Sequence, residues 1–152
     1  MSMRLARPAL LAAAVLLAAA CSSPATTAPA VPSSGPTSPS AATRIEVTLT
    51  DAMKIEPAAI AVPAGVPVTF VVTNTGSLDH EFYLGDEAAQ AEHEQEMQSM
   101  GGMMHEDPNG ISLKAGESKE LTHTFTAGET LAGCHVAGHY AGGMKATITV
   151  TG

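Results

Sequence analysis

Side chains able to bind a metal ion are concentrated in one short stretch near the C-terminus, residues 134–144. It contains a thiol (Cys134), an imidazole (His139) and a thioether (Met144), separated by glycines that allow a tight backbone turn. Thiolate, imidazole and thioether together suit copper better than calcium, magnesium or manganese. A trigonal copper site needs a second imidazole, and His80, at the end of another apolar segment, is the best candidate.

The segments around this stretch have the period-two alternation that is typical of β-strands. Residues 44–50, for example, place Ile45, Val47 and Leu49 on one face. Short segments of this kind, separated by Gly and Pro turns, predict an all-β, antiparallel β-sandwich. The expected strands are 44–50, 58–62, 66–73, 80–84, 111–113, 121–126 and 145–151.

One segment departs from the strand pattern. Residues 86 to about 100 are rich in Glu, Ala and Gln, which predicts an inserted helix. On that helix His93, Met97 and Met100 share a face, and thioethers and imidazoles suit cuprous ion. A second copper site is therefore conceivable; the alternative is a lid whose methionines pack on the sandwich. Its candidate ligands are His93, Met97, Met100, Met103, Met104 and His105.

Two further histidines are expected to have other roles. His123 lies on a strand face with Leu121 and Phe125, and we interpret it as a structural or rim histidine. His135 follows Cys134 directly, and adjacent side chains of an extended backbone point in opposite directions. We therefore expect His135 to point away from the metal and to be solvated.

The spacing Cys134-x4-His139-x4-Met144 resembles the copper loop of the cupredoxins, the blue-copper proteins. Residues 79–82 and 134–140 are similar to bacterial plastocyanin-like copper proteins in particular. The resemblance covers roughly residues 44–152 and implies a Greek-key, cupredoxin-like sandwich. It also implies one type 1 copper ion, with His80, Cys134 and His139 as equatorial ligands and Met144 as the weak axial ligand.

The sequence departs from the cupredoxin pattern immediately after the first histidine. Many cupredoxins have Asn or Ser there, which supports the site by hydrogen bonding, whereas this chain has Glu81. Because groups around the ligands tune a metal centre, the spectrum and potential stay open at this point.

The resemblance implies one-electron transfer between Cu(II) and Cu(I) outside the cytoplasm. The alternative is copper capture, delivery or resistance, with the Met/His segment binding additional Cu(I). A structural sandwich without metal is disfavoured, because it would leave the ligand spacing unexplained. The sequence has neither a paired acid and base nor a nucleophile triad, so we expect a carrier or binder and not an enzyme.

The first residues have the features of an export signal. Arg4 and Arg7 precede an apolar run, 9–19, that is too short to span a bilayer. Residues 18–21, Ala-Ala-Ala-Cys, resemble a lipoprotein processing site, so residues 1–20 are expected to be removed and Cys21 to carry lipid. The alternative is ordinary cleavage next to an unmodified Cys21. The predicted location is the outer face of the cytoplasmic membrane, or the periplasm.

Composition divides the rest of the chain in two. Residues 21–43 are nearly all Ser, Pro, Ala, Thr and Gly after the cysteine, which predicts a disordered tether. Residues 44–152 are expected to form one copper-binding domain. If Cys21 carries lipid, Cys134 has no disulfide partner in the chain, and metal ligation explains an unpaired thiol in an exported protein.

Charge bears on the partners. Loss of Arg4 and Arg7 would leave five Lys and Arg against fifteen Asp and Glu, a net charge of −10. Without a basic patch to neutralise phosphate, a nucleic-acid role is excluded. The acidic surface fits docking to a basic redox partner or a copper-handling protein, or solubility alone. We expect a monomer, held at the membrane by its lipid.

Overall fold

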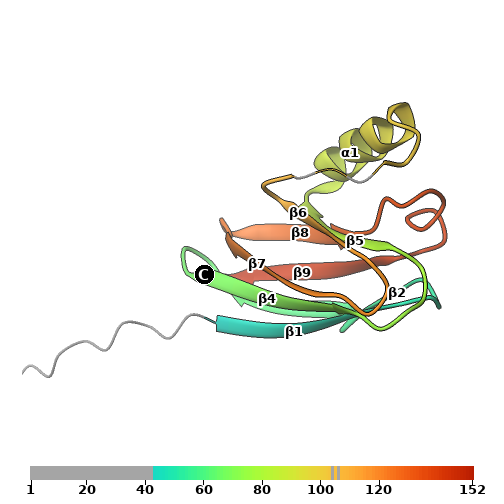
Figure 1. The fold of residues 1–152 in the computed structure, drawn as a ribbon. Coiled ribbons are helices and arrows are strands. Elements are labelled where there is room, and N and C mark those ends of the chain that lie inside the picture. Colours follow the sequence, from blue (N-terminus) through green and yellow to red (C-terminus); the bar gives the residue numbers. More distant parts are fainter. Residues whose placement is uncertain (1–42, 104, 106) are drawn as a thin grey trace, which may run out of the picture. The chain divides into compact units, whose positions relative to one another are not determined.

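A computed structural model describes residues 43–103, 105 and 107–152, which form a β-sandwich with one helix (Figure 1). The elements in chain order are β1 (Thr43–Thr50), β2 (Lys54–Glu56), β3 (Ala59–Pro63), β4 (Pro67–Asn74), β5 (His80–Gly85), α1 (Glu87–Ser99), β6 (Gly110–Leu113), β7 (Ser118–Thr124), β8 (Gly128–Gly133) and β9 (Lys145–Thr151). The predicted all-β sandwich with one inserted helix is confirmed.

The strands form two sheets, in the orders β2-β1-β4-β7 and β3-β9-β8-β5-β6. The sequence predicted antiparallel sheets, and this prediction is wrong for one strand pair in each sheet. Strand β1 pairs with β4 in parallel, and β3 pairs with β9 in parallel. The other strand pairs are antiparallel, among them β5 with β8 and β8 with β9. These pairs bring the start of β5 close to the end of β8, and thereby His80 close to Cys134.

The core lies between the two sheets. Phe70 of β4 is central: its ring centroid lies 5.3 Å from that of Phe82 and 6.0 Å from that of Phe125. Cys134 and Met144 belong to the same buried cluster as these rings. The candidate loop is therefore attached to the hydrophobic core and does not hang from the sandwich as a free loop.

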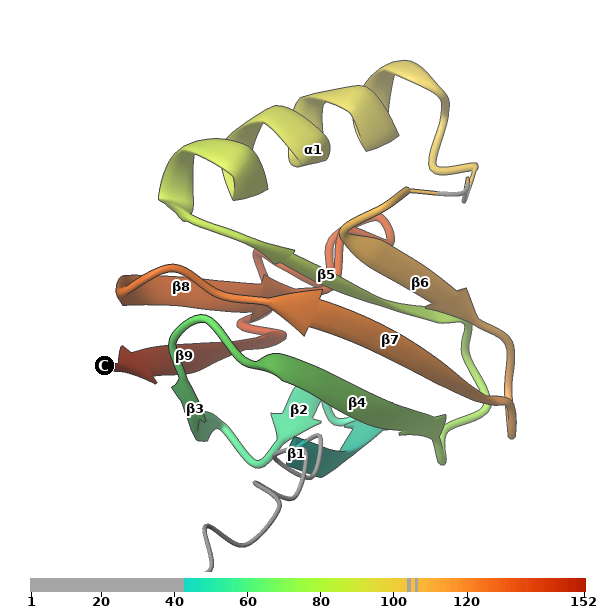
Figure 2. The same ribbon diagram turned by 90° about the vertical axis from the view of Figure 1, so that its left-hand side faces the viewer.

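Helix α1 lies outside the sandwich, next to the five-stranded sheet (Figures 1 and 2). It begins where the sequence predicts, with the Asp86 side chain accepting a hydrogen bond from the Ala89 N–H, and it ends at the C-cap residue Met100. Its buried residues are Gln90, His93 and Met97. In the part of the chain that the structure describes, no helix is long and apolar enough to cross a membrane.

Close packing of α1 on the sheet depends on Gly133 in β8. A Cβ atom at this position would lie 2.8 Å from Cε2 of Tyr140 and would collide with the Gln90 amide oxygen. The Gln90 amide nitrogen in turn donates to the carbonyls of Tyr83, Gly85 and Leu131, which ties the helix to β5 and β8.

Several sequence predictions fall outside the described residues. They are the signal segment 1–20, the lipid on Cys21 and residues 22–42 of the tether. They stay predictions, as do the location at the membrane and the monomeric state.

Candidate metal site

Three predicted ligands meet at one end of the sandwich. His80 is the first residue of β5, Cys134 follows β8 directly, and His139 lies in the connection to β9. His80 Nδ1 and His139 Nδ1 are 3.2 Å apart, and Cys134 Sγ lies 3.9 Å from the first and 3.4 Å from the second. All three residues are buried.

These separations fit a bound metal ion. With bond lengths of about 2.0–2.1 Å to imidazole and about 2.3 Å to thiolate, as for zinc, trigonal to tetrahedral geometry separates two nitrogens by roughly 3.3–3.6 Å and nitrogen from sulfur by roughly 3.5–3.8 Å. The observed separations lie within about 0.2 Å of those ranges. The donor set of two imidazoles and one thiolate also matches the trigonal part of a blue-copper site.

Backbone hydrogen bonds hold the ligand loop closed. The Cys134 N–H donates to the Met144 carbonyl at 3.1 Å, and the Met144 N–H donates to the His139 carbonyl at 3.0 Å. Gly138 and Gly143 have φ values of +84° and +92°, which favour glycine. The loop thus brings its three candidate ligand residues together through its own backbone.

Met144 is completely buried among the core residues. Its backbone is bonded to both other candidate ligands of the loop, which agrees with a position next to the site. The axial role of its sulfur stays a prediction.

The sheet alternation explains which side chains reach the site. Cys134 points into the sandwich with Phe82 and Leu84. His135, one residue further, points to the opposite face and bonds with Gln90 and Glu94 of α1, both at 2.7 Å. The prediction that His135 points away from Cys134 is confirmed, but its expected solvated position is wrong: the residue is 1% exposed, because α1 covers it.

Glu81, the residue that departs from the cupredoxin pattern, contacts the site through its backbone. Its N–H donates to Cys134 Sγ at 3.3 Å. Its carboxylate lies on the other face of the sheet, 2.9 Å from Nε2 of His93, and accepts from the His135 N–H at 3.2 Å. The Glu81 side chain therefore hydrogen-bonds with His93 and His135 between α1 and the sheet, while its backbone N–H donates a hydrogen bond to the Cys134 sulfur.

Burial favours the neutral forms of two candidate ligands. It raises the pKa of the Cys134 thiol to about 11, and it lowers the pKa of His139, to which His80 contributes as well. A cation bound between them would reverse this preference for the thiol, because a coordinated thiol loses its proton. Loss of the thiol proton is thus coupled to the binding of the metal ion.

Asp51 contacts the ring nitrogen of His80 that faces away from the other two candidate ligands. His80 Nε2 lies 3.3 Å from Asp51 Oδ1, which leaves His80 Nδ1 facing Cys134 and His139. The same carboxylate accepts from the Ser77 N–H and hydroxyl and from the Leu78 N–H. These hydrogen bonds, with the Ser77 hydroxyl as the largest contributor, hold the pKa of Asp51 well below its usual value. Such carboxylate–histidine pairs fix the ring orientation of metal-binding histidines.

We expect Asp51→Ala to weaken metal binding without removing it. Loss of an outer partner of this kind typically costs about 10–100-fold in affinity, and residues 77–78 lose their acceptor, so the unfolding midpoint should fall as well. Competition of wild type and variant for copper against a chelator measures the first effect. Asp79→Ala is the control, because Asp79 is exposed and lies next to His80 in sequence; equal losses in the two variants would contradict the role of Asp51.

The predicted ligands of the Met/His segment do not all lie together in the structure. Met97 is 1% exposed and lies on the buried face of α1, Met103 is 69% exposed, and Met104 lies outside the described residues. What does converge is a different set, His93, Glu96 and His105. Sequence reasoning missed Glu96, although its position three residues after His93 on a helix was a usable signal.

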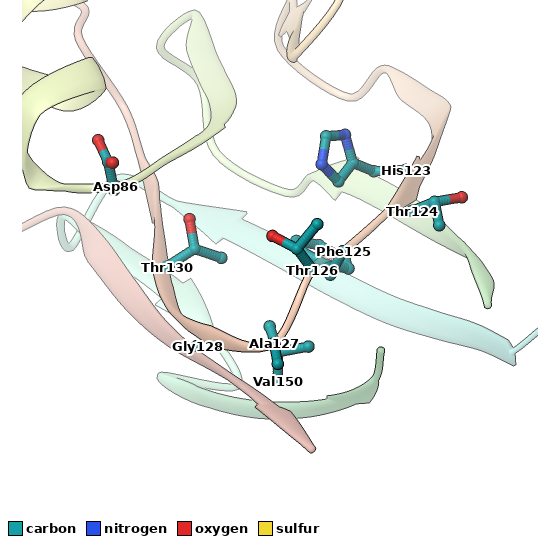
Figure 3. A pocket seen from close by; sticks show the side chains of 9 residues that line it. All are labelled: Asp86, His123, Thr124, Phe125, Thr126, Ala127, Gly128, Thr130 and Val150. Carbon is teal, nitrogen blue, oxygen red and sulfur yellow. The ribbon is translucent and has the colours of Figure 1, made fainter. Parts of the chain in front are cut away.

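A pocket of about 460 Å3 lies beside the connection between β7 and β8 (Figure 3). His123, Phe125 and Thr130 are among its lining residues, and none of the three clustered ligands is. Burial lowers the pKa of His123, whose ring lies 4.6 Å from that of Phe125. These observations agree with the structural or rim position expected for this histidine.

A β-sandwich of this topology with a buried cluster of one cysteine and two histidines is the arrangement expected of a copper-binding, cupredoxin-like protein. Residues 10–100 match the sequence profile of the cupredoxin-like domain. The chain belongs to this family.

Two curated relatives carry the same name, copper-resistant cuproprotein CopI. The protein from Rubrivivax gelatinosus is 39% identical over 107 residues, and the one from Pseudomonas aeruginosa is 40% identical over 136 residues. Each match covers 70% of this chain. The chain spans 65% of the Rubrivivax protein, slightly less than two thirds, and 75% of the Pseudomonas protein.

Solved structures agree on the fold. Auracyanin from Roseiflexus castenholzii superimposes with a TM-score of 0.65 at 25% identity, covering 73% of this chain and 98% of its own. An azurin from Methylomonas sp. strain J gives 0.63 at 18% identity, covering 74% and 100%. The second likeness bears on the fold alone.

Proposed function

We propose that this protein binds one copper ion through His80, Cys134 and His139, with Met144 as the axial ligand, and that it serves copper resistance. The observation that carries the proposal is the convergence of two imidazole nitrogens and one thiol sulfur, all buried, at separations that fit a single ion. The bound ion would supply the redox chemistry. The protein's residues provide the donors, exclude water and donate a hydrogen bond to the sulfur.

Resistance as the biological role is supported by the relatives, which are named copper-resistant cuproproteins. A buried site with a thiolate holds copper away from other reactive groups, which is one physical route to protection. This was the alternative in the sequence analysis, and the relatives' names favour it over simple electron transfer.

One-electron transfer is the second candidate, and one observation favours it. The three clustered side chains are held by the sheet pairing, the closed loop and the bond from His80 to Asp51. A rigid trigonal set of this type suits both Cu(II) and Cu(I), so little rearrangement would accompany a change of oxidation state. This second candidate function also requires a redox partner protein, which we propose without identifying it.

Copper tolerance tests the resistance role. In a strain lacking the gene, we expect the wild-type protein to restore growth in elevated copper and His139→Ala, produced at the same level, to fail, because the variant loses one of three clustered donors. His123→Ala is the matched control, since His123 lies outside the cluster, and it should restore growth. Equal tolerance with wild type and His139→Ala would refute resistance through this site. If the wild-type protein nevertheless showed a copper spectrum, one-electron transfer would be the remaining candidate function.

A further inference from the structure

A second group of potential ligands lies under and beside the C-terminal half of α1. His93 and Glu96 share a helix face, and the segment after the helix adds His105. One ligand atom from each residue lies within 4.8 Å of the others. None of the three belongs to the Cys134 site.

Two ring nitrogens in this group are buried and have no hydrogen-bond partner among the described residues, His93 Nδ1 and His105 Nδ1. The nearest recorded contact of His93 Nδ1 is Glu96 Oε2 at 3.6 Å, which is too long for a hydrogen bond. His93 itself is 1% exposed. Buried polar atoms are rarely left without a partner in native proteins. Two such nitrogens in one cluster therefore indicate that a ligand binds between them.

The hydrogen bonding of His93 leaves the unpaired nitrogen free to bind a metal. On its other side, Nε2 lies 2.9 Å from the Glu81 carboxylate, which can only accept while it is ionised. In the neutral ring the proton is then on Nε2, and Nδ1 carries the lone pair. Tyr83 fixes the ring plane, since the two rings stack at 3.9 Å with 3° between their planes. This carboxylate–histidine arrangement is the one that typically orients a metal ligand.

We propose that His93, Glu96 and His105 form a second metal site for a divalent ion of borderline softness. Two imidazoles and one carboxylate suit zinc(II) and copper(II), and copper(II) ranks highest in affinity at such sites. Three protein ligands leave a coordination position open for water or an incoming group. The Glu96 side chain is 55% exposed, so the ion can enter from solvent.

This site differs from the cuprous site that the sequence suggested. Of the predicted thioether ligands, Met103 is 69% exposed, and Met97 is buried on the inner face of α1. The described cluster consists of nitrogen and oxygen donors, which favour a divalent ion over Cu(I). Glu96, and not a methionine, completes the set.

Glu81 connects the second site to the first. Its carboxylate holds His93, and its backbone N–H donates to Cys134 Sγ. An ion on His93 would therefore lie one hydrogen bond away from the residue that contacts the thiolate.

A zinc titration tests the proposal. The purified protein is loaded with one equivalent of copper to fill the Cys134 site and is then titrated with zinc(II) by calorimetry. We expect one further equivalent to bind, and we expect Glu96→Gln and His105→Ala each to weaken it at least about tenfold. Glu92→Gln and His123→Ala should bind as wild type does, because Glu92 is exposed on the same helix and neither residue belongs to the cluster.

The outcomes separate this proposal from the proposed function. If no second equivalent binds, or if Glu96→Gln and His105→Ala bind zinc as tightly as wild type, the second site is refuted. If Met97→Leu abolishes binding and Glu96→Gln does not, the ion is held by thioethers and the proposal is wrong. If the Cys134 site shows no copper signal but the zinc equivalent remains sensitive to Glu96, the second site stands and the proposed function fails.

Discussion

Replacing Cys134 with serine should abolish the intense visible absorption of the copper(II) protein and weaken copper binding by orders of magnitude. That absorption requires a thiolate bonded to copper, and Cys134 is the one thiol in the described cluster. A serine hydroxyl stays protonated at neutral pH, and a hydroxyl is a harder donor than a thiolate. Optical and paramagnetic resonance spectra of the copper(II) forms measure the first effect, and competition with a chelator measures the second.

Met144→Leu is the matched control for this experiment. Leucine keeps the volume of the buried side chain, so the fold should lose less than about 1.5 kcal/mol. Because only the weak axial donor is removed, the absorption should persist with a shifted maximum. An unchanged band in Cys134→Ser would exclude Cys134 as the thiolate ligand, and an unchanged maximum in Met144→Leu would argue against an axial bond.

Glu81→Ala should be strongly destabilising even without metal. The carboxylate is buried, lies 2.9 Å from His93 Nε2 and accepts from the backbone N–H of His135 at 3.2 Å. Its removal leaves both donors buried without an acceptor, at about 1–3 kcal/mol each, so the free energy of unfolding should fall by roughly 2–6 kcal/mol. Urea unfolding of the metal-free proteins measures the change, provided that the m-value is constant.

Glu92→Ala provides the comparison, since Glu92 is exposed on α1 and substitutions of that kind usually change stability by less than about 0.5 kcal/mol. Glu81→Gln, which keeps the size and one acceptor, should fall between the two. A loss no larger in Glu81→Ala than in Glu92→Ala would mean that the hydrogen bonds under α1 contribute little to stability.

The principal cluster was predictable because its information is local. Cys134 and His139 follow one another at fixed spacing in a glycine-containing loop, and the alternation of an extended backbone determines that Cys134 and His135 face opposite ways. Helix α1 was predictable for the same reason, from a run of good helix formers after the N-cap residue Asp86. Only His80 had to be placed from a distant segment, from the need for a second imidazole, and the resemblance to cupredoxins implied the same residue.

The supporting residues were not predictable, because their partners are far away in the sequence. Asp51 lies 29 positions before His80, and nothing in its neighbourhood indicates that the two meet. The burial of His135 depends on α1 packing over β8, a contact that strand alternation cannot reveal. The parallel pairings of β1 with β4 and β3 with β9 are likewise invisible in the alternation, which is the same for either strand direction.

The origin of the ligands from two separate segments has a mechanical consequence. His80 and Cys134 lie 54 positions apart, so an ion bound to both would act as a cross-link that closes a long loop of the chain. Cross-links of that span restrict the unfolded chain by an amount on the order of 4 kcal/mol in chain-entropy models. Copper bound there would lock β5 to the end of β8, and the loaded protein would resist heat and proteases better than the empty one. Release of the ion would remove this cross-link, so copper release and loss of stability would occur together.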